Sequence, residues 1–182
     1  MRVLVVPPVR VKRDSLPSAF DAVFGPAMLR RVHGPDTQVG LFDKNQRRFS
    51  FRVAVPEVPP QIRRFFCGTD LKVTTRQHLG ISSTKWQVTN KMKLHFVGSE
   101  FFKLRPVFWL EERPAEAGDG VEVYLGGSVR HDAVLPPPLN GIAEAFMMAS
   151  SEKELRHFGQ CLAEAGVVDP AQPSRPVQVD SC

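Results

Sequence analysis

The sequence predicts an α+β protein: a curved antiparallel sheet of about seven strands holding a long C-terminal helix, with two short helices after the first strand. Apolar and charged residues alternate with a period of two along successive segments between residues 39 and 130. No helical pattern interrupts these segments, which excludes the crossover connections of a parallel sheet. A long helical pattern from about Leu139 to Ala165 follows the last strand. The length of 182 residues fits one domain, which we place at 1–168, with a flexible Pro-rich tail at 169–182.

The N-terminal segment predicts one strand and a broken helix. Residues 2–12 are apolar and extended in character, but they contain Pro7-Pro8. Proline cannot donate to a strand ladder, so this strand is expected at a sheet edge or bent. Apolar residues from Phe20 to Leu29 recur at helical spacing, and Gly25-Pro26 between them predicts two short helices.

The central strands predict one buried face and one charged face. Phe49, Phe51 and Val53 alternate with Arg48 and Arg52, the clearest example of this pattern. A polar hairpin turn at residues 43–46 precedes this strand. The expected residues of the buried concave face are Phe49, Phe51, Val53, Trp86, Val88, Phe102, Leu104, Phe108, Val123 and Leu125.

The C-terminal helical segment carries apolar residues on two sides. Ile142 and Phe146 share one side, whereas Leu155 and Phe158 lie roughly opposite at 100° per residue. The helix is therefore either buried on two faces or bent near Ser150-Ser151. We expect Phe146 to contact the concave sheet face.

Composition excludes several classes of protein. The apolar fraction of 42% excludes a disordered chain, and the absence of heptads or Gly repeats excludes a coiled coil or a collagen-like fibre. The three cysteines, Cys67, Cys161 and Cys182, are widely spaced and odd in number, which excludes a disulfide scaffold. No apolar run is long enough for a membrane span or a secretory signal. We therefore expect an intracellular protein, soluble or peripheral, of unassigned organelle.

The net charge of +5 is concentrated in the middle of the chain. Residues 44–106 carry thirteen Lys and Arg against three acidic residues. Such a segment is either a solvated sheet face or a surface for an anionic membrane or an acidic protein. Nucleic acid is less favoured, because no aromatic RNA-binding motif, zinc signature or helix-turn-helix pattern occurs. The candidate anionic-partner surface comprises Lys72, Arg76, Lys85, Lys91, Lys93, Lys103 and Arg105.

The order of elements resembles that of the START-like, helix-grip superfamily, which includes the birch-pollen allergen, polyketide cyclases and steroidogenic lipid-transfer domains. The resemblance covers about residues 2–165 and rests on the paired helices around Phe20–Leu29 and the helix after Leu139. Val55 through Phe66, the Gly98 turn and the stretch from Gly127 to Pro138 add a faint likeness to uncharacterised bacterial members. The superfamily's glycine-rich loop between strands two and three is absent, since residues 43–46 form that turn here. The resemblance implies a cavity between sheet and helix that often holds an apolar ligand.

The apolar inner faces fit either a ligand pocket or a filled core, and the resemblance favours the pocket. Three polar residues, Thr75, Gln77 and Asn90, fall on the same faces. A buried amide without a partner costs about 1–3 kcal/mol, so Gln77 and Asn90 require a ligand, a water, a core partner or a position near solvent. The candidate ligand-binding residues are Phe51, Val53, Gln77, Trp86, Val88, Asn90, Phe102, Phe108, Phe146 and Met147.

Catalytic and metal signatures are not apparent in the sequence. The five histidines lack the spacing of a zinc site, and no cofactor is expected. No GxSxG or phosphate-binding glycine pattern occurs. The sequence therefore predicts a non-enzymatic domain that binds an apolar or amphipathic, lipid-like molecule. The alternatives are a subunit that docks to a larger assembly through its basic sheet face, and a cyclase- or hydrolase-like enzyme.

Overall fold

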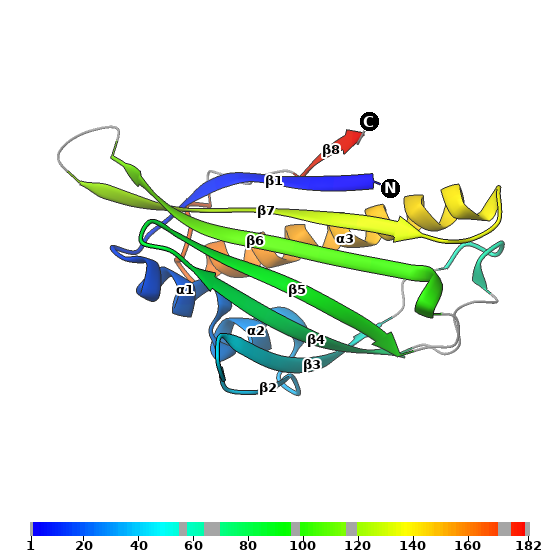
Figure 1. Cartoon of the computed structure of the whole chain (residues 1–182), viewed down its shortest axis with the longest axis horizontal. Coiled ribbons are helices and arrows are strands. Elements are labelled where there is room, and N and C mark those ends of the chain that lie inside the picture. Colours follow the sequence, from blue (N-terminus) through cyan, green and yellow to red (C-terminus); the bar gives the residue numbers. More distant parts are fainter. Residues whose placement is uncertain are drawn as a thin grey trace.

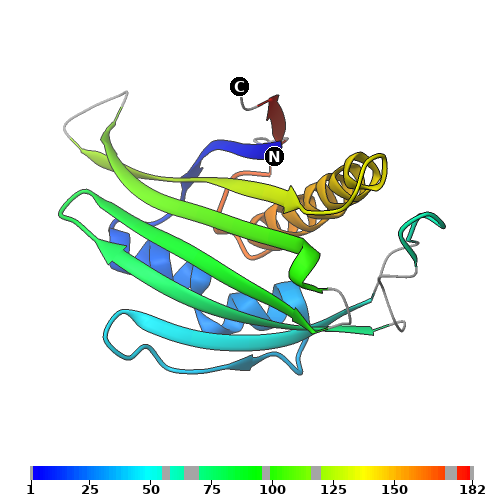
Figure 2. The ribbon, with the colours of Figure 1, turned by 45° about the vertical axis from the view of Figure 1, so that its right-hand side comes forward.

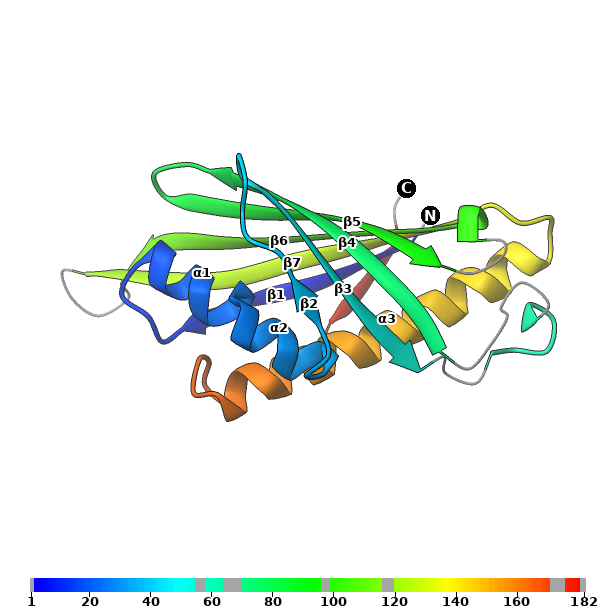
Figure 3. The same ribbon diagram turned by 90° about the horizontal axis from the view of Figure 1, so that it is seen from below.

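The structure, a computed structural model, describes residues 2–54, 58–63, 70–95, 99–115, 120–170 and 176–180. Within these ranges the chain forms an eight-stranded sheet, in which every pairing is antiparallel, and three α-helices on one of its faces (Figures 1 and 3). The strands are β1 (Arg2–Val11), β2 (Gln38–Val39), β3 (Gln46–Ala54), β4 (Asp70–Ile81), β5 (Lys85–His95), β6 (Phe102–Pro114), β7 (Val121–Ala133) and β8 (Val177–Asp180). The helices are α1 (Leu16–Phe24), α2 (Pro26–His33) and α3 (Leu139–Glu164).

The predicted α+β class and the position of the helices are confirmed. The spatial order of the strands is β2-β3-β4-β5-β6-β7-β1-β8, so neighbours in sequence are neighbours in the sheet from β2 to β7. The sheet curves around the helices, with α1 and α2 under one part and α3 running along its length (Figure 2). None of the helices in the described ranges is long and apolar enough to cross a membrane.

The eighth strand comes from the segment expected to be a flexible tail. Residues 177–180 pair antiparallel with Arg2–Val5 of β1. The structure thus gives these four residues a strand at the sheet edge, which the sequence did not predict. Val177 and Val179 remain about half exposed there, so this edge strand contributes little to the core.

Strand β1 is bent rather than at the edge of the sheet. It lies between β7 and β8, and its register with β7 shifts between Val6 and Val9, where Pro7-Pro8 interrupts the ladder. Strand β8 pairs only with the part of β1 before the prolines. The missing proline N–H groups are thus accommodated by an irregularity, as the bent alternative predicts.

The predicted break between the short helices is confirmed at Gly25. The Ser15 side chain caps the first turn of α1 by accepting from the Ser18 N–H. At the other end the Gly25 N–H donates to the Asp21 carbonyl at 2.8 Å. A Cβ at Gly25 would lie 2.2 Å from that carbonyl oxygen, so glycine is needed for this close approach at the break between the helices, and Pro26 then begins α2.

The predicted alternation along β3 is confirmed. Phe49 and Phe51 are buried, whereas Arg48 and Arg52 are exposed. Lys44 and Asn45, at the centre of the preceding turn, both have positive φ angles of 45° and 61°, as a tight two-residue hairpin requires. Of the ten expected concave-face residues, Val53, Trp86, Leu104 and Phe108 are half-buried and the other six are buried.

Helix α3 is buried along several sets of residues. Ala143 and Met147, in its N-terminal half, pack with Phe102 of β6. Cys161 and Leu162, in its C-terminal half, pack in the larger cluster that includes α1. Met148 and Leu155, near the middle of the helix, pack in a third cluster with Leu4 of β1 and Val129 of β7, so different parts of α3 are buried against different parts of the sheet.

Candidate functional site

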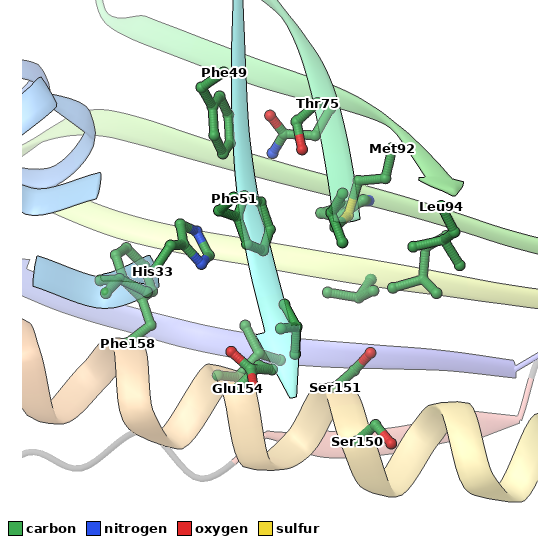
Figure 4. A pocket seen from close by; sticks show the side chains of 18 of the residues that line it. His33, Phe49, Phe51, Thr75, Met92, Leu94, Ser150, Ser151, Glu154 and Phe158 are labelled. Carbon is green, nitrogen blue, oxygen red and sulfur yellow. The ribbon is translucent and has the colours of Figure 1, made fainter. Parts of the chain in front are cut away.

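A cavity of about 250 Å³ lies between the concave face of the sheet and helices α2 and α3. Its walls are almost entirely apolar and come from the two short helices, from β3 to β7 and from α3. Figure 4 shows Phe49 and Phe51 of β3 and Met92 and Leu94 of β5 facing Phe158 on α3 across this space. The volume is close to the lower limit of typical small-molecule sites, about 300 Å³.

Eight of the ten candidate ligand-binding residues line this cavity. These eight are Phe51, Val53, Gln77, Asn90, Phe102, Phe108, Phe146 and Met147. Trp86 and Val88 do not line it and pack instead in the core cluster that includes α1. They lie on the same face of β5, but α1 covers that end of the sheet, and the Phe20 ring packs 5.5 Å from the Trp86 ring.

Several cavity residues come from the helices and were not among the candidates. His33, at the end of α2, stacks on Phe51 with ring centroids 3.9 Å apart. Burial, and secondarily the nearby His157, lower the pKa of His33 to about 4, so its imidazole is neutral at pH 7. Ser151 and Phe158 of α3 also line the cavity. Only Phe158 carried a sequence signal, through its place on the second apolar side of the helix.

A row of three polar side chains lies at the buried end of the cavity, where two of them, Gln77 and Asn90, line its wall. Arg47, Gln77 and Asn90 are direct neighbours on three adjacent strands, since Arg47 is in register with Gln77 and Gln77 with Asn90. The Arg47 Nε donates to Gln77 Oε1 at 2.6 Å, and an Arg47 terminal nitrogen donates to the Phe24 carbonyl. Gln77 is thus satisfied by a partner within the protein, one of the alternatives left open by the sequence.

Arg47 is a buried cation that sequence analysis missed. It is only 5% exposed, and its guanidinium carbon lies 4.5 Å from the centre of the Phe42 ring. Burial lowers its pKa to about 10, while attraction to Asp21 opposes that effect, so the side chain remains charged at pH 7. The signal was present in the alternation of β3, because Arg47 is two residues before the inward-facing Phe49.

At the same end of the cavity, two buried polar atoms have no hydrogen-bond partner among the described residues. They are Thr75 Oγ1 and Asn90 Oδ1, on side chains that are 1% and 6% exposed. Both residues line the cavity. Buried polar groups are almost always paired in folded proteins, so these two atoms are exceptions on the cavity wall.

A serine and a histidine meet at the opposite wall. The Ser151 Oγ of α3 lies 2.7 Å from Nε2 of His131 on β7, and both residues are buried. Burial lowers the pKa of His131 to about 4, so the pair is a neutral hydrogen bond at pH 7. It fixes the middle of α3 to the sheet beside the cavity.

Cys161 is not arranged as a nucleophile. Burial, and secondarily the charge of Glu164, raise the pKa of its thiol. The nearby His157 Nε2, 3.7 Å from the sulfur, also lies 3.2 Å from the Val32 carbonyl, to which it can only donate. The same nitrogen therefore cannot accept the thiol proton. Cys67 and Cys182 lie outside the described residues, and no group of three potential metal ligands occurs within those residues.

The cations of the proposed anionic-partner surface lie on the convex side of the sheet, and all but one of them are exposed. Lys72, Arg76, Lys91, Lys93, Lys103 and Arg105 are exposed. Lys85 is half-buried, 3.8 Å from the Glu111 carboxylate and 5.3 Å from the centre of the Trp109 ring. The β5–β6 ladder extends only to the Thr89–Val107 pair, so Lys91 and Lys93 are not in register with the cations of β6.

Comparisons with known proteins find similar folds among solved structures. A conserved protein from Geobacillus kaustophilus superposes with a TM-score of 0.52 at 6% identity, over 91% of this chain and 95% of that one. A protein from Thermus thermophilus gives a TM-score of 0.47 at 13% identity, over 87% of this chain and 99% of that one. No protein-family model and no curated protein sequence matches the chain. The observed antiparallel sheet with a C-terminal helix is consistent with a helix-grip fold, and the superposition on the Geobacillus kaustophilus protein supports this coarse description.

Proposed function

We propose that this protein is a non-enzymatic binding protein for a small apolar or amphipathic molecule held between the sheet and α3. The observation that carries the proposal is the cavity of about 250 Å³ with apolar walls. A core packed to normal density leaves few voids larger than a water molecule, so this volume requires an explanation. Membership of the START-like superfamily, whose members often hold such ligands, is part of the same proposal.

The size of the cavity limits the ligand. A cavity of roughly 150 Å³ accepts benzene, which scales to roughly ten non-hydrogen atoms in about 250 Å³. Leu71, Leu94 and Leu155, on its walls, are half-buried, so a longer chain has a route to solvent between the sheet and α3.

The test uses purified protein and a probe without polar groups. Solvent extraction and mass spectrometry identify any co-purifying molecule. Naphthalene, which matches the cavity in size, is then titrated into the stripped protein and followed by amide chemical shifts. We expect saturable shifts at residues of β3 to β5 and α3 in the parent. They should be lost in Val73→Phe, which fills the cavity, and kept in the control Ile81→Phe, which lies at the exposed end of β4. The absence of saturable binding, together with an empty extract, would refute the proposal.

A second candidate function is docking of the convex sheet face onto an anionic partner. Arg48, Arg76 and Lys91 are in register on three adjacent strands, and all three are exposed. Like charges placed directly opposite each other destabilise a sheet. Within the described residues none of the three forms an ion pair, so an external anion is the partner that would relieve their repulsion.

Co-sedimentation with anionic vesicles at low and high salt tests this second function. Exposed charges are screened over about 8–10 Å at physiological salt, so binding should weaken steeply as salt rises. The double variant Lys91→Glu/Lys93→Glu should lose vesicle binding. The control double variant Lys153→Glu/Arg156→Glu makes the same change in net charge on α3 and should keep it. Binding that is equal in both double variants would reject this face as the docking surface.

A further inference from the structure

On the β4 wall of the cavity, the buried end is polar and the end toward solvent is apolar. Along β4 the cavity residues run from Gln77 and Thr75, which are 2% and 1% exposed, through Val73 to the half-buried Leu71. Phe24 of α1 also lines the cavity, and its carbonyl holds Arg47 at the polar end. An amphipathic molecule in this space therefore places its head group inward and its apolar tail toward solvent.

The hydrogen bond from Arg47 fixes what Gln77 offers to such a head group. A guanidinium can only donate, so the amide oxygen of Gln77 must face Arg47, at the observed 2.6 Å. The amide NH₂ of Gln77 is then the group left for another partner, and it is a donor. Arg47 itself does not line the cavity, and two of its nitrogens are already bonded to protein oxygens.

Asn90 Oδ1 and Thr75 Oγ1, which have no partner among the described residues, define what else the head group must supply. Asn90 is in register with Gln77 on the next strand, and its Oδ1 is an acceptor without a donor among the described residues. Thr75 is two residues from Gln77 on the same face of β4 and points into the cavity in Figure 4. Its hydroxyl can donate or accept. The site therefore needs a group that gives one proton to Asn90 and accepts from Thr75 or Gln77.

We propose that the ligand is an uncharged amphipathic alcohol whose hydroxyl enters first and binds Asn90, Thr75 and Gln77. This inference rests on the proposed cavity-binding function and specifies its ligand class. A hydroxyl both donates and accepts, so it satisfies all three groups at once. An ether or ketone has no proton for Asn90, and a carboxylate has none at neutral pH.

The experiment compares three probes by isothermal titration calorimetry on the stripped protein: 1-octanol, heptyl methyl ether and octanoate. The ether has the same number of non-hydrogen atoms as the alcohol but no hydroxyl proton. One hydrogen bond to a buried acceptor corresponds to about a 5- to 10-fold difference in Kd. We expect 1-octanol to bind more tightly than the ether by this factor and more tightly than octanoate.

Isosteric variants assign the preference to the named atoms. Asn90→Leu and Thr75→Val should each reduce the preference of 1-octanol over the ether to about 2-fold or less. Both should raise the Tm of the ligand-free protein, because each removes a buried polar atom that lacks a partner. The control Thr89→Val, on the opposite face of β5, should leave both the preference and the Tm unchanged.

Each other outcome has a definite meaning. If naphthalene binds but the alcohol binds no more tightly than the ether, the ligand class is wrong and the cavity-binding function stands. If octanoate binds more tightly than 1-octanol, the proposal of an alcohol ligand is also wrong. If the variants lower the Tm and leave the preference intact, these polar atoms serve the fold and the inference fails. If neither naphthalene nor 1-octanol binds, both proposals fail.

Discussion

Removing the partner of the buried Arg47 should destabilise the protein by an amount that the structure lets us estimate. In Gln77→Leu the Arg47 Nε loses its acceptor while the side chain stays 95% buried and charged, since its pKa is about 10. A hydrogen bond to a charged group contributes about 1.5–3 kcal/mol, and leaving a buried donor unpaired removes all of it. We therefore expect the free energy of unfolding to fall by about 2–3 kcal/mol.

A double-mutant cycle separates this pairing from general packing. Arg47→Met alone leaves Gln77 Oε1 unpaired and should also destabilise, but Arg47→Met/Gln77→Leu replaces both polar groups with apolar ones and should cost less than the sum. The measurement is urea unfolding at pH 7, with Gln87→Leu on the exposed face of β5 as the matched control. We expect a coupling of about 1.5–3 kcal/mol and a control within about 0.5 kcal/mol of the parent. If the losses of the two single variants simply add up in the double variant, the hydrogen bond between Arg47 and Gln77 does not contribute to stability.

Three further predictions concern packing and pH. Phe146→Ala should lower the free energy of unfolding by less than the same change at a fully packed phenylalanine does, which is about 3–5 kcal/mol, because a cavity already adjoins this half-buried ring. A loss of about 4 kcal/mol or more, measured from the unfolding midpoint, would contradict the cavity. Gly127→Ala should destabilise the protein by about 1–3 kcal/mol, since the new Cβ would lie 2.5 Å from the Phe108 ring. In the control Gly159→Ala, on α3, the new Cβ meets no atom within 4 Å and should stabilise the protein by about 0.5–1 kcal/mol. Equal effects of the two variants in thermal unfolding would contradict the contact between Gly127 and Phe108. The folded pKa of His131 is lowered to about 4 from 6.5, so the unfolded chain binds its proton first and stability falls as pH drops from about 6.5 to 4. The difference in unfolding free energy between pH 7.5 and 4.5 should therefore be about 2–3 kcal/mol smaller in His131→Gln than in the parent, and parallel pH profiles would contradict the assignment.

The sequence predicted the concave wall of the cavity because strands obey a local rule. Side chains alternate between the two faces of a strand, so Phe49 and Phe51 fall on one side and Arg48 and Arg52 on the other wherever the strand lies. The same rule placed Gln77 and Asn90 on the inner face, where both are buried. It also places Arg47, two residues before Phe49, on the inner face, but sequence analysis did not recognise this charged residue as an inward one.

Local sequence patterns did not predict which helix covers which part of the sheet. Trp86 and Val88 share a face with Asn90, yet α1 covers the first two and leaves Asn90 at the cavity. Periodicity reports which way a side chain points but not which element lies above it, because that depends on contacts between residues far apart in the chain. For the same reason His33 and Ser151 carried no sequence signal as cavity residues.

The sequence by itself determined the order of the elements, the break at Gly25, the faces of the strands and the long C-terminal helix, since each follows from local propensity and periodicity. Only the tertiary structure decided that residues 177–180 join the sheet, that Arg47 is held by Gln77, and that the cavity ends at unpartnered atoms of Thr75 and Asn90. Strand register and the curvature of the sheet set these distances. Both are properties of many residues acting together, so no short segment of the sequence contains them.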